Sequence, residues 1–127
     1  KYSIPVFPNS GVSVSPLIKL NVNGHLIRYL SFGWQGNQYF YVYYRDLYRA
    51  LGKAYEHYVR DARRMLLDNQ AVEENIDYID SLPFPGKDKK HAYWLSLPTA
   101  IHFCMMQGTS QAAFVKKSLL LLSSKND

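Results

Sequence analysis

The sequence predicts an α+β domain in which a small antiparallel sheet is followed by a helix-turn-helix-like pair of helices, a basic hairpin loop and two C-terminal helices. Alternating apolar and polar stretches separated by glycine-containing turns fill residues 17–43, which is typical of a strand meander. A glycine at position 52 then divides two helical patterns. Two further apolar segments after residue 96 recur at helical spacing. With 127 residues and 47% hydrophobic content, the chain is long enough for one such domain.

The first sixteen residues differ in composition from the rest. Residues 1–16 hold three prolines, one glycine and four serines, and they have little apolar surface to bury. We therefore expect an extended arm at 1–16 and a single domain over 17–127. The absence of an initiator Met suggests an excised or processed piece of a longer protein, with this domain as its N-terminal part.

Three strands are expected next. LIKLNV (17–22) and HLIRYLSF (25–32) alternate on either side of Asn23-Gly24, a strong signal for a two-residue hairpin turn. After a second glycine-containing turn, the aromatic and β-branched run Tyr39–Tyr43 suits a half-buried strand.

A pair of helices follows the third strand. Leu47 and Leu51 are one helical turn apart, and Gly52 can adopt the left-handed conformation that ends a helix. A second helix is expected to begin near Ala54. At about 100° per residue, one side of it is apolar and is expected to face the core. The residues on this side are Tyr55, Tyr58, Val59, Ala62 and Leu66.

The opposite side of the second helix carries a basic stripe that extends back into the first helix by four-residue spacing. The members of this stripe are Arg45, Arg49, Lys53, His57, Arg60 and Arg64. Glu56 and Asp61 are expected to point to its flanks and leave it uncompensated, and an uncompensated stripe attracts phosphate. The alternative is an ordinary solvated outer face, which is the usual role of Lys and Arg on amphipathic helices.

A hairpin with a basic tip is expected after the helix pair. NIDYID (75–80) and AYWLSL (92–97) flank a segment that contains two prolines and a glycine. The cations at this tip are Lys87, Lys89, Lys90 and His91. Such a loop can contact a sugar-phosphate backbone beside a helix-turn-helix, and the alternative is a solvated charged loop.

Two helices end the chain. Ser96 offers an N-cap, Pro98 suits a first turn, and Ala100–Gln107 is apolar and stops at Gly108. Thr109 or Ser110 caps the last helix, whose recurring apolar residues are Ala112, Phe114, Val115, Leu119 and Leu122. The run of four leucines at 119–122 is apolar all round and calls for a second surface. A homodimer contact, a further C-terminal domain, or burial in the same domain would supply it.

Composition narrows the function classes. A net charge of +5 and a pI near 9.3 favour acidic partners such as nucleic acid or anionic lipid. A single cysteine, Cys104, excludes an internal disulfide and fits a reducing compartment. With neither a secretory leader nor an apolar run near 18 residues, we expect no membrane partner and a cytoplasmic location.

Catalytic chemistry finds little support in the sequence. His102 and Cys104 are two apart on a predicted helix and point to different faces, which disfavours a metal site. Asp80 with Asp88-Lys89-Lys90 only weakly matches the spacing of a magnesium-dependent nuclease. We therefore expect a non-enzyme that needs no cofactor.

Two stretches resemble one family. NGHLIRYLSFGWQGNQYFYVYYRDLYRALG (23–52) resembles the start of the Bro-N domain of phage antirepressors and viral Bro proteins, with Asn-Gly-His, an aromatic strand, then Asp, Leu and Ala-Leu-Gly in the first helix. AYWLSLPTAIHF (92–103) resembles the segment before the C-terminal helices of phage antirepressors. The chain departs from the usual pattern at Tyr43-Tyr44 and in its proline-rich start. The resemblance implies a DNA-binding or regulatory module from phage or prophage.

The basic stripe and the resemblance to the Bro-N family together predict a transcriptional regulator that binds double-stranded DNA. The basic stripe is expected to contact the duplex, and Lys87, Lys89 and Lys90 a flanking phosphate. The rival hypothesis is an antirepressor module that sequesters a repressor protein without binding DNA, with its basic face on an acidic repressor surface.

Overall fold

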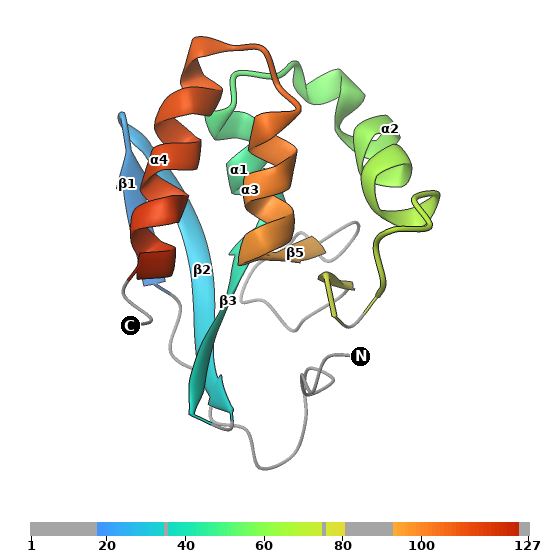
Figure 1. Ribbon diagram of the computed structural model, residues 1–127. Helices are drawn as coiled ribbons and strands as arrows, with labels where there is room; N and C mark the ends of the chain where they lie inside the picture. Colours follow the sequence, from blue (N-terminus) through green and yellow to red (C-terminus); the bar gives the residue numbers. More distant parts are fainter. Residues whose placement is uncertain (1–17, 35, 75, 81–92, 125–127) are drawn as a thin grey trace.

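The computed structural model of the chain describes residues 18–34, 36–74, 76–80 and 93–124. These residues form a five-stranded antiparallel sheet with helices packed against it (Figure 1). The predicted α+β class is confirmed. The arm predicted for residues 1–16 lies outside the described residues.

The predicted meander is present. Strands β1 (Ile18–Val22), β2 (His25–Trp34) and β3 (Asn37–Tyr43) pair consecutively and antiparallel. The residues of the first turn, Asn23 and Gly24, have positive φ angles of 50° and 87°, as a type I′ hairpin turn requires. This turn fixes the register of β1 against β2.

The predicted second hairpin also forms, and it joins the same sheet. Strands β4 (Tyr78–Asp80) and β5 (Tyr93–Ser96) pair antiparallel, and β5 also pairs with β3, so the strand order is β1-β2-β3-β5-β4. The sequence did not predict that β3 and β5 are neighbours, because periodicity reports which residues are buried and not which strand lies beside which. The tip of the hairpin lies outside the described residues.

The helix pair begins directly after β3. Helix α1 (Tyr44–Ala50) ends before Gly52, whose φ of 75° confirms the predicted glycine stop. After a four-residue turn the chain resumes as a 3-10 turn, η1 (Tyr55–His57), then α2 (Tyr58–Ala62) and a π-helical turn, η2 (Arg63–Leu67). The second helix is therefore a succession of three kinds of turn and not one uniform rod.

The C-terminal helices are α3 (Leu97–Met105) and α4 (Ser110–Ser124), which lie side by side in front of the sheet (Figure 1). The predicted N-cap is confirmed, since the Ser96 hydroxyl accepts the backbone N–H of Thr99 at 3.3 Å. The hydroxyl of Thr109 likewise accepts a backbone N–H in the first turn of α4 at 3.3 Å.

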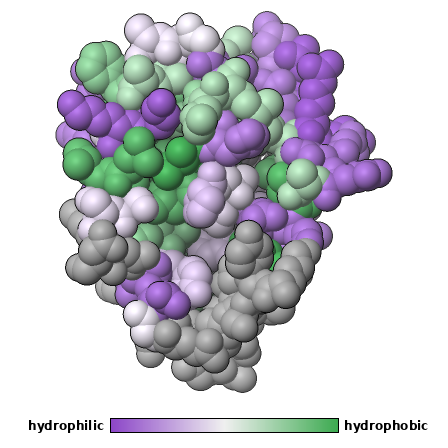
Figure 2. Space-filling model, in the orientation of Figure 1, coloured by the Kyte–Doolittle hydropathy of each residue, from purple (hydrophilic) through white to green (hydrophobic). Residues whose placement is uncertain are grey.

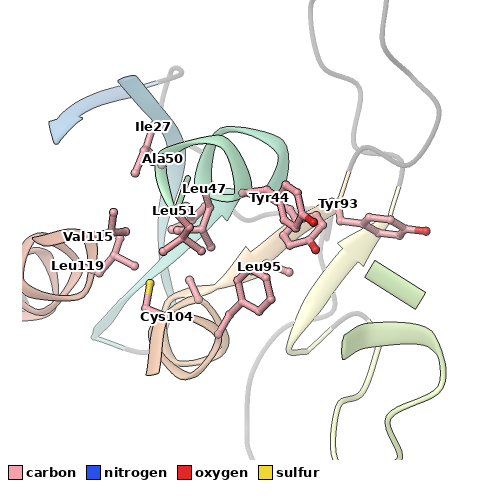
Figure 3. Close-up of a cluster of buried hydrophobic side chains, with 14 of the residues drawn as sticks. Ile27, Tyr44, Leu47, Ala50, Leu51, Tyr93, Leu95, Cys104, Val115 and Leu119 are labelled. Atoms are coloured by element: carbon pink, nitrogen blue, oxygen red, sulfur yellow. The ribbon is translucent and has the colours of Figure 1, made fainter. Parts of the chain in front are cut away.

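The main core lies between the sheet and the helices. Leu47 of α1 and Leu51, directly after this helix, face Val115 and Leu119 of α4, and Cys104 of α3 is next to them (Figure 3). Burial raises the pKa of the Cys104 thiol to about 12, so this cysteine packs as a small apolar residue. Four of the five residues predicted on the inner side of α4 are buried, whereas Phe114 is 56% exposed.

A second cluster covers the other face of the sheet and is mostly aromatic. Phe32 stacks on Tyr41 with 5.7 Å between ring centroids, and Tyr43 lies 5.0 Å from Trp94. The Tyr41 hydroxyl donates to the backbone carbonyl of Ile76 at 2.8 Å, and burial raises the pKa of Tyr41 to about 12. The many tyrosines therefore serve mainly to fill the core.

Candidate functional site

The outer face of α2 and η2 carries three exposed arginines, Arg60, Arg63 and Arg64. At about 100° per residue, they lie roughly opposite the side of the helix that packs inward. The buried residues of that inner side are Tyr58, Ala62, Met65 and Leu66. The predicted outward position of Arg60 and Arg64 is therefore confirmed. Sequence reasoning missed Arg63 as a member of this face.

The inner face of the second helix was predicted with a partly wrong set of residues. Tyr55 is 49% exposed and Val59 is 44% exposed, whereas Met65, which was not predicted, is buried. The reason is that a single rotation of about 100° per residue was applied to a segment that begins as a 3-10 turn. The exposed Tyr55 ring instead stacks on Tyr58 with 5.3 Å between centroids.

The helix changes its winding where two of the arginines lie. The backbone N–H of Asp68 donates to the carbonyl of Arg63 at 2.8 Å, five residues back, as in a π-helical turn. Such turns are rare and occur frequently at functional sites. The π-helical turn η2 widens the helix where Arg63 and Arg64 lie.

Asp61 does not leave the basic stripe uncompensated, and that prediction is wrong. Its side chain is 13% exposed and lies 3.4 Å from Lys53 Nζ and 3.4 Å from Arg60 Nε. It also accepts a hydrogen bond of 2.7 Å from the Tyr48 hydroxyl of α1. Burial tends to raise the pKa of Asp61, but the Tyr48 hydrogen bond and the charges of Lys53 and Arg60 outweigh it and lower the pKa.

Lys53 belongs to the packing between helices and not to an outer stripe. Its ammonium donates to Gln107 Oε1 at 2.9 Å, beyond the end of α3, and lies 5.7 Å from the centre of the Tyr48 ring. Together with the nearby Asp61 carboxylate, these contacts hold the side chain to 26% exposure. Lys53 therefore ties the turn after α1 to the end of α3.

The other members of the predicted stripe lie in different surroundings. The Arg45 guanidinium lies over the rings of Tyr58 and Tyr55, at 4.7 Å and 5.4 Å from their centres. His57 Nε2 is 3.4 Å from a carboxylate oxygen of Glu56. Arg49 is exposed but faces the β1–β2 hairpin instead of α2. Lys53, Arg45, His57 and Arg49 thus each lie in a different environment. Arg60 and Arg64 remain together on the outer face.

Arg28, which is partly exposed, and Asp46, which is buried, form an ion pair near Arg49. The Arg28 Nε and Nη2 atoms donate to the two carboxylate oxygens of Asp46 at 2.7 Å and 2.9 Å, and the Arg28 backbone N–H adds a third bond of 2.9 Å. These hydrogen bonds to Asp46 raise the pKa of Arg28, although burial opposes the shift. Asp46 therefore joins the start of α1 to β2.

The basic loop and the last helix complete the predicted sites. Lys87, Lys89 and Lys90 lie outside the described residues. On α4, Phe114, Leu120 and Leu121 are between 48% and 60% exposed. Figure 2 shows hydrophilic residues over α2 at the right and a more hydrophobic surface, interrupted by hydrophilic residues, over α4 at the left.

A hollow of about 630 Å³ lies between the start of β3 and helix α3. Its walls include Tyr39, Phe40, Ile101 and Met105, with His102 at the same site. None of the residues predicted to bind DNA lines it. Across the described ranges, no three His, Cys, Asp or Glu side chains gather closely enough to hold a metal ion.

No protein-family model, curated protein or solved structure matches the chain. The relation to the Bro-N family therefore stays a prediction that rests on the resemblance of residues 23–52 and 92–103. None of the helices in the described parts of the chain has the length and apolar character needed to cross a membrane.

Proposed function

We propose that this chain is the DNA-binding domain of a phage- or prophage-type transcriptional regulator, acting in the cytoplasm of a bacterial or phage-infected cell. One observation carries the proposal. Residues 45–64 expose four arginines and one glutamate, while Asp46 and Asp61 are turned inward. The exposed residues therefore carry a net charge of +3, with four arginines against a single acid.

The exposed side chains suit phosphate chemically. Arginine presents a planar fork of N–H donors that matches two phosphate oxygens, and it stays charged at any physiological pH. Arg60 keeps 52% of its side chain exposed although it lies beside Asp61. Arg49, Arg60, Arg63 and Arg64 are the proposed backbone contacts. Lys53 and Arg45 act in this proposal by holding the two helices together.

Binding to a labelled duplex of random sequence, followed by fluorescence anisotropy across a salt series, tests the proposal. Each neutralised phosphate contributes about −0.9 to the slope of log affinity against log salt, so four arginine contacts predict a slope of about −4. A flat salt response, or no binding at low salt, would overturn DNA binding by this surface.

A second candidate is the repressor-binding module, and the exposed apolar residues of α4 favour it. Phe114 and Leu121 are seven residues apart on this helix and 56% and 60% exposed, which suits a protein contact. The same surface would also serve a homodimer through the C-terminal helix. Sedimentation of the chain alone and with a candidate repressor distinguishes the two, because only the homodimer forms without the second protein.

A further inference from the structure

A second basic site lies on the other side of α1, where the β1–β2 hairpin meets the helix. A hollow of about 360 Å³ there is lined by cations from three elements, with Gly24 at its edge. Its basic residues are Lys19 of β1, His25 and Arg28 of β2, and Arg49 of α1. Asp46 is the carboxylate among the lining residues.

The hairpin register brings like charges together at this site. Lys19 and Arg28 are direct cross-strand partners, so their side chains leave the same face of the sheet. Like charges in this position destabilise an antiparallel pair. Asp46 and Arg49 are three residues apart on α1 and are therefore neighbours on its surface. The fold thus concentrates positive charge where a purely structural surface would disperse it.

Asp46 is already engaged by one of these cations. Its side chain is 3% exposed and accepts three hydrogen bonds from Arg28, two of them from the guanidinium. Lys19 and Arg49 are both exposed, and neither makes an ion pair with a carboxylate in the described part of the chain. The walls of the hollow therefore carry two positive charges in excess when His25 is neutral.

We propose that this hollow binds a phosphate group. Lys19 supplies charge from β1 and Arg49 from α1, and His25 adds a donor beside the hairpin turn. Because Asp46 already holds the Arg28 side chain in place, Arg28 loses little additional side-chain entropy when an anion binds. We assign this phosphate to a phosphodiester of the DNA whose backbone α2 contacts. This assignment rests on the proposed function.

Two measurements on the whole chain test the site. In the first, inorganic phosphate is titrated into labelled protein while NMR spectra of the backbone amides and arginine Nε–H groups are recorded. We expect saturable shifts confined to the β1–β2 hairpin and the Arg28 and Arg49 side chains. In the second, the salt slope of duplex binding is compared for the wild type and for Lys19→Ala with Arg49→Ala.

The double variant removes two contacts, so the slope should become shallower by about 2. Its matched control is Lys116→Ala with Lys117→Ala on α4, which removes the same charge from the helix layer on the opposite face of the sheet. The control should shift the slope far less. Unchanged thermal unfolding midpoints verify that both variants fold, as expected where exposed side chains such as Lys19 and Arg49 are shortened.

The outcomes separate the site from the proposed function. Localised phosphate shifts with a shallower slope assign the group to the DNA backbone. Localised shifts with an unchanged slope support the site but assign it to a free phosphate compound. If phosphate causes no localised shift and the slope is unchanged, the site is refuted and Arg49 is not a backbone contact. A wild-type slope of about −3, as Arg60, Arg63 and Arg64 alone predict, would then leave DNA binding through α2 intact.

Discussion

Asp46 and Asp61 lie at two junctions made by helix α1, and they hold neighbouring cations in different ways. Asp46 joins α1 to β2 and binds Arg28 through three hydrogen bonds. Asp61 joins α2 to α1 and is shared by Tyr48, Lys53 and Arg60, with both cations at 3.4 Å. The first carboxylate engages one arginine fully, whereas the second leaves Arg60 half-exposed. Arg28 is therefore held by its acid, whereas Arg60 stays on the surface although an acid lies beside it.

The largest expected effect comes from breaking the Asp46 junction. Arg28→Ala leaves a carboxylate that is 3% exposed without its cation, and we expect it to lower the free energy of unfolding by about 3–5 kcal/mol. Asp46→Asn should cost less, about 2 kcal/mol, because the Arg28 side chain is 30% exposed and can still reach water. Urea denaturation of both variants measures the two values. Equal losses would mean that packing, and not charge burial, stabilises this junction.

A smaller effect is expected at the Asp61 junction. Tyr48→Phe removes a hydrogen bond of 2.7 Å to a carboxylate and should cost about 1–2 kcal/mol. Tyr44→Phe is the matched control, because the buried Tyr44 hydroxyl has no hydrogen-bond partner in the described part of the chain. Removing that hydroxyl should be neutral or slightly stabilising.

The two phenylalanine variants are compared by their urea midpoints. Burial raises the pKa of Tyr44, so its hydroxyl stays protonated. The rings of Tyr44 and Tyr48 both pack against that of Tyr58, at 4.9 Å and 5.4 Å between centroids, and phenylalanine keeps these ring contacts. If Tyr44→Phe destabilises the protein as much as Tyr48→Phe does, the Asp61 hydrogen bond has no special role in joining α1 to α2.

Local signals in the sequence predicted much of the fold. Asn23-Gly24 predicts the hairpin turn. Counting outward from that turn also places Lys19 opposite Arg28, which is the signal in the sequence for the basic hollow. Gly52 gave the end of α1, and Ser96 gave the start of α3. Each of these features depends on backbone geometry within a few residues.

The candidate site was less predictable because its contacts are distant in sequence or depend on irregular turns. Lys53 reaches Gln107, and Arg28 reaches Asp46, across 54 and 18 positions. Tyr55 was placed in the core because a uniform helical rotation was assumed through a 3-10 turn. Pattern and spacing predicted which side of α2 faces outward, but not that Asp61 of the same helix turns toward Lys53 and Arg60.

The proposal that α2 binds DNA is tested most directly by comparing two charge-matched variants in the duplex binding assay. Arg60→Gln with Arg64→Gln removes two cations from the outer face of α2, and Lys116→Gln with Lys117→Gln removes two from α4. Glutamine is preferred to glutamate because a carboxylate at position 60 would repel Asp61.

We expect the α2 variant to lose most of its affinity at low salt and to show a slope shallower by about 2, with a nearly unchanged unfolding midpoint. The α4 variant should bind almost as the wild type does. Equal losses in the two variants would show that binding follows net charge alone and would contradict a specific role for the arginines of α2.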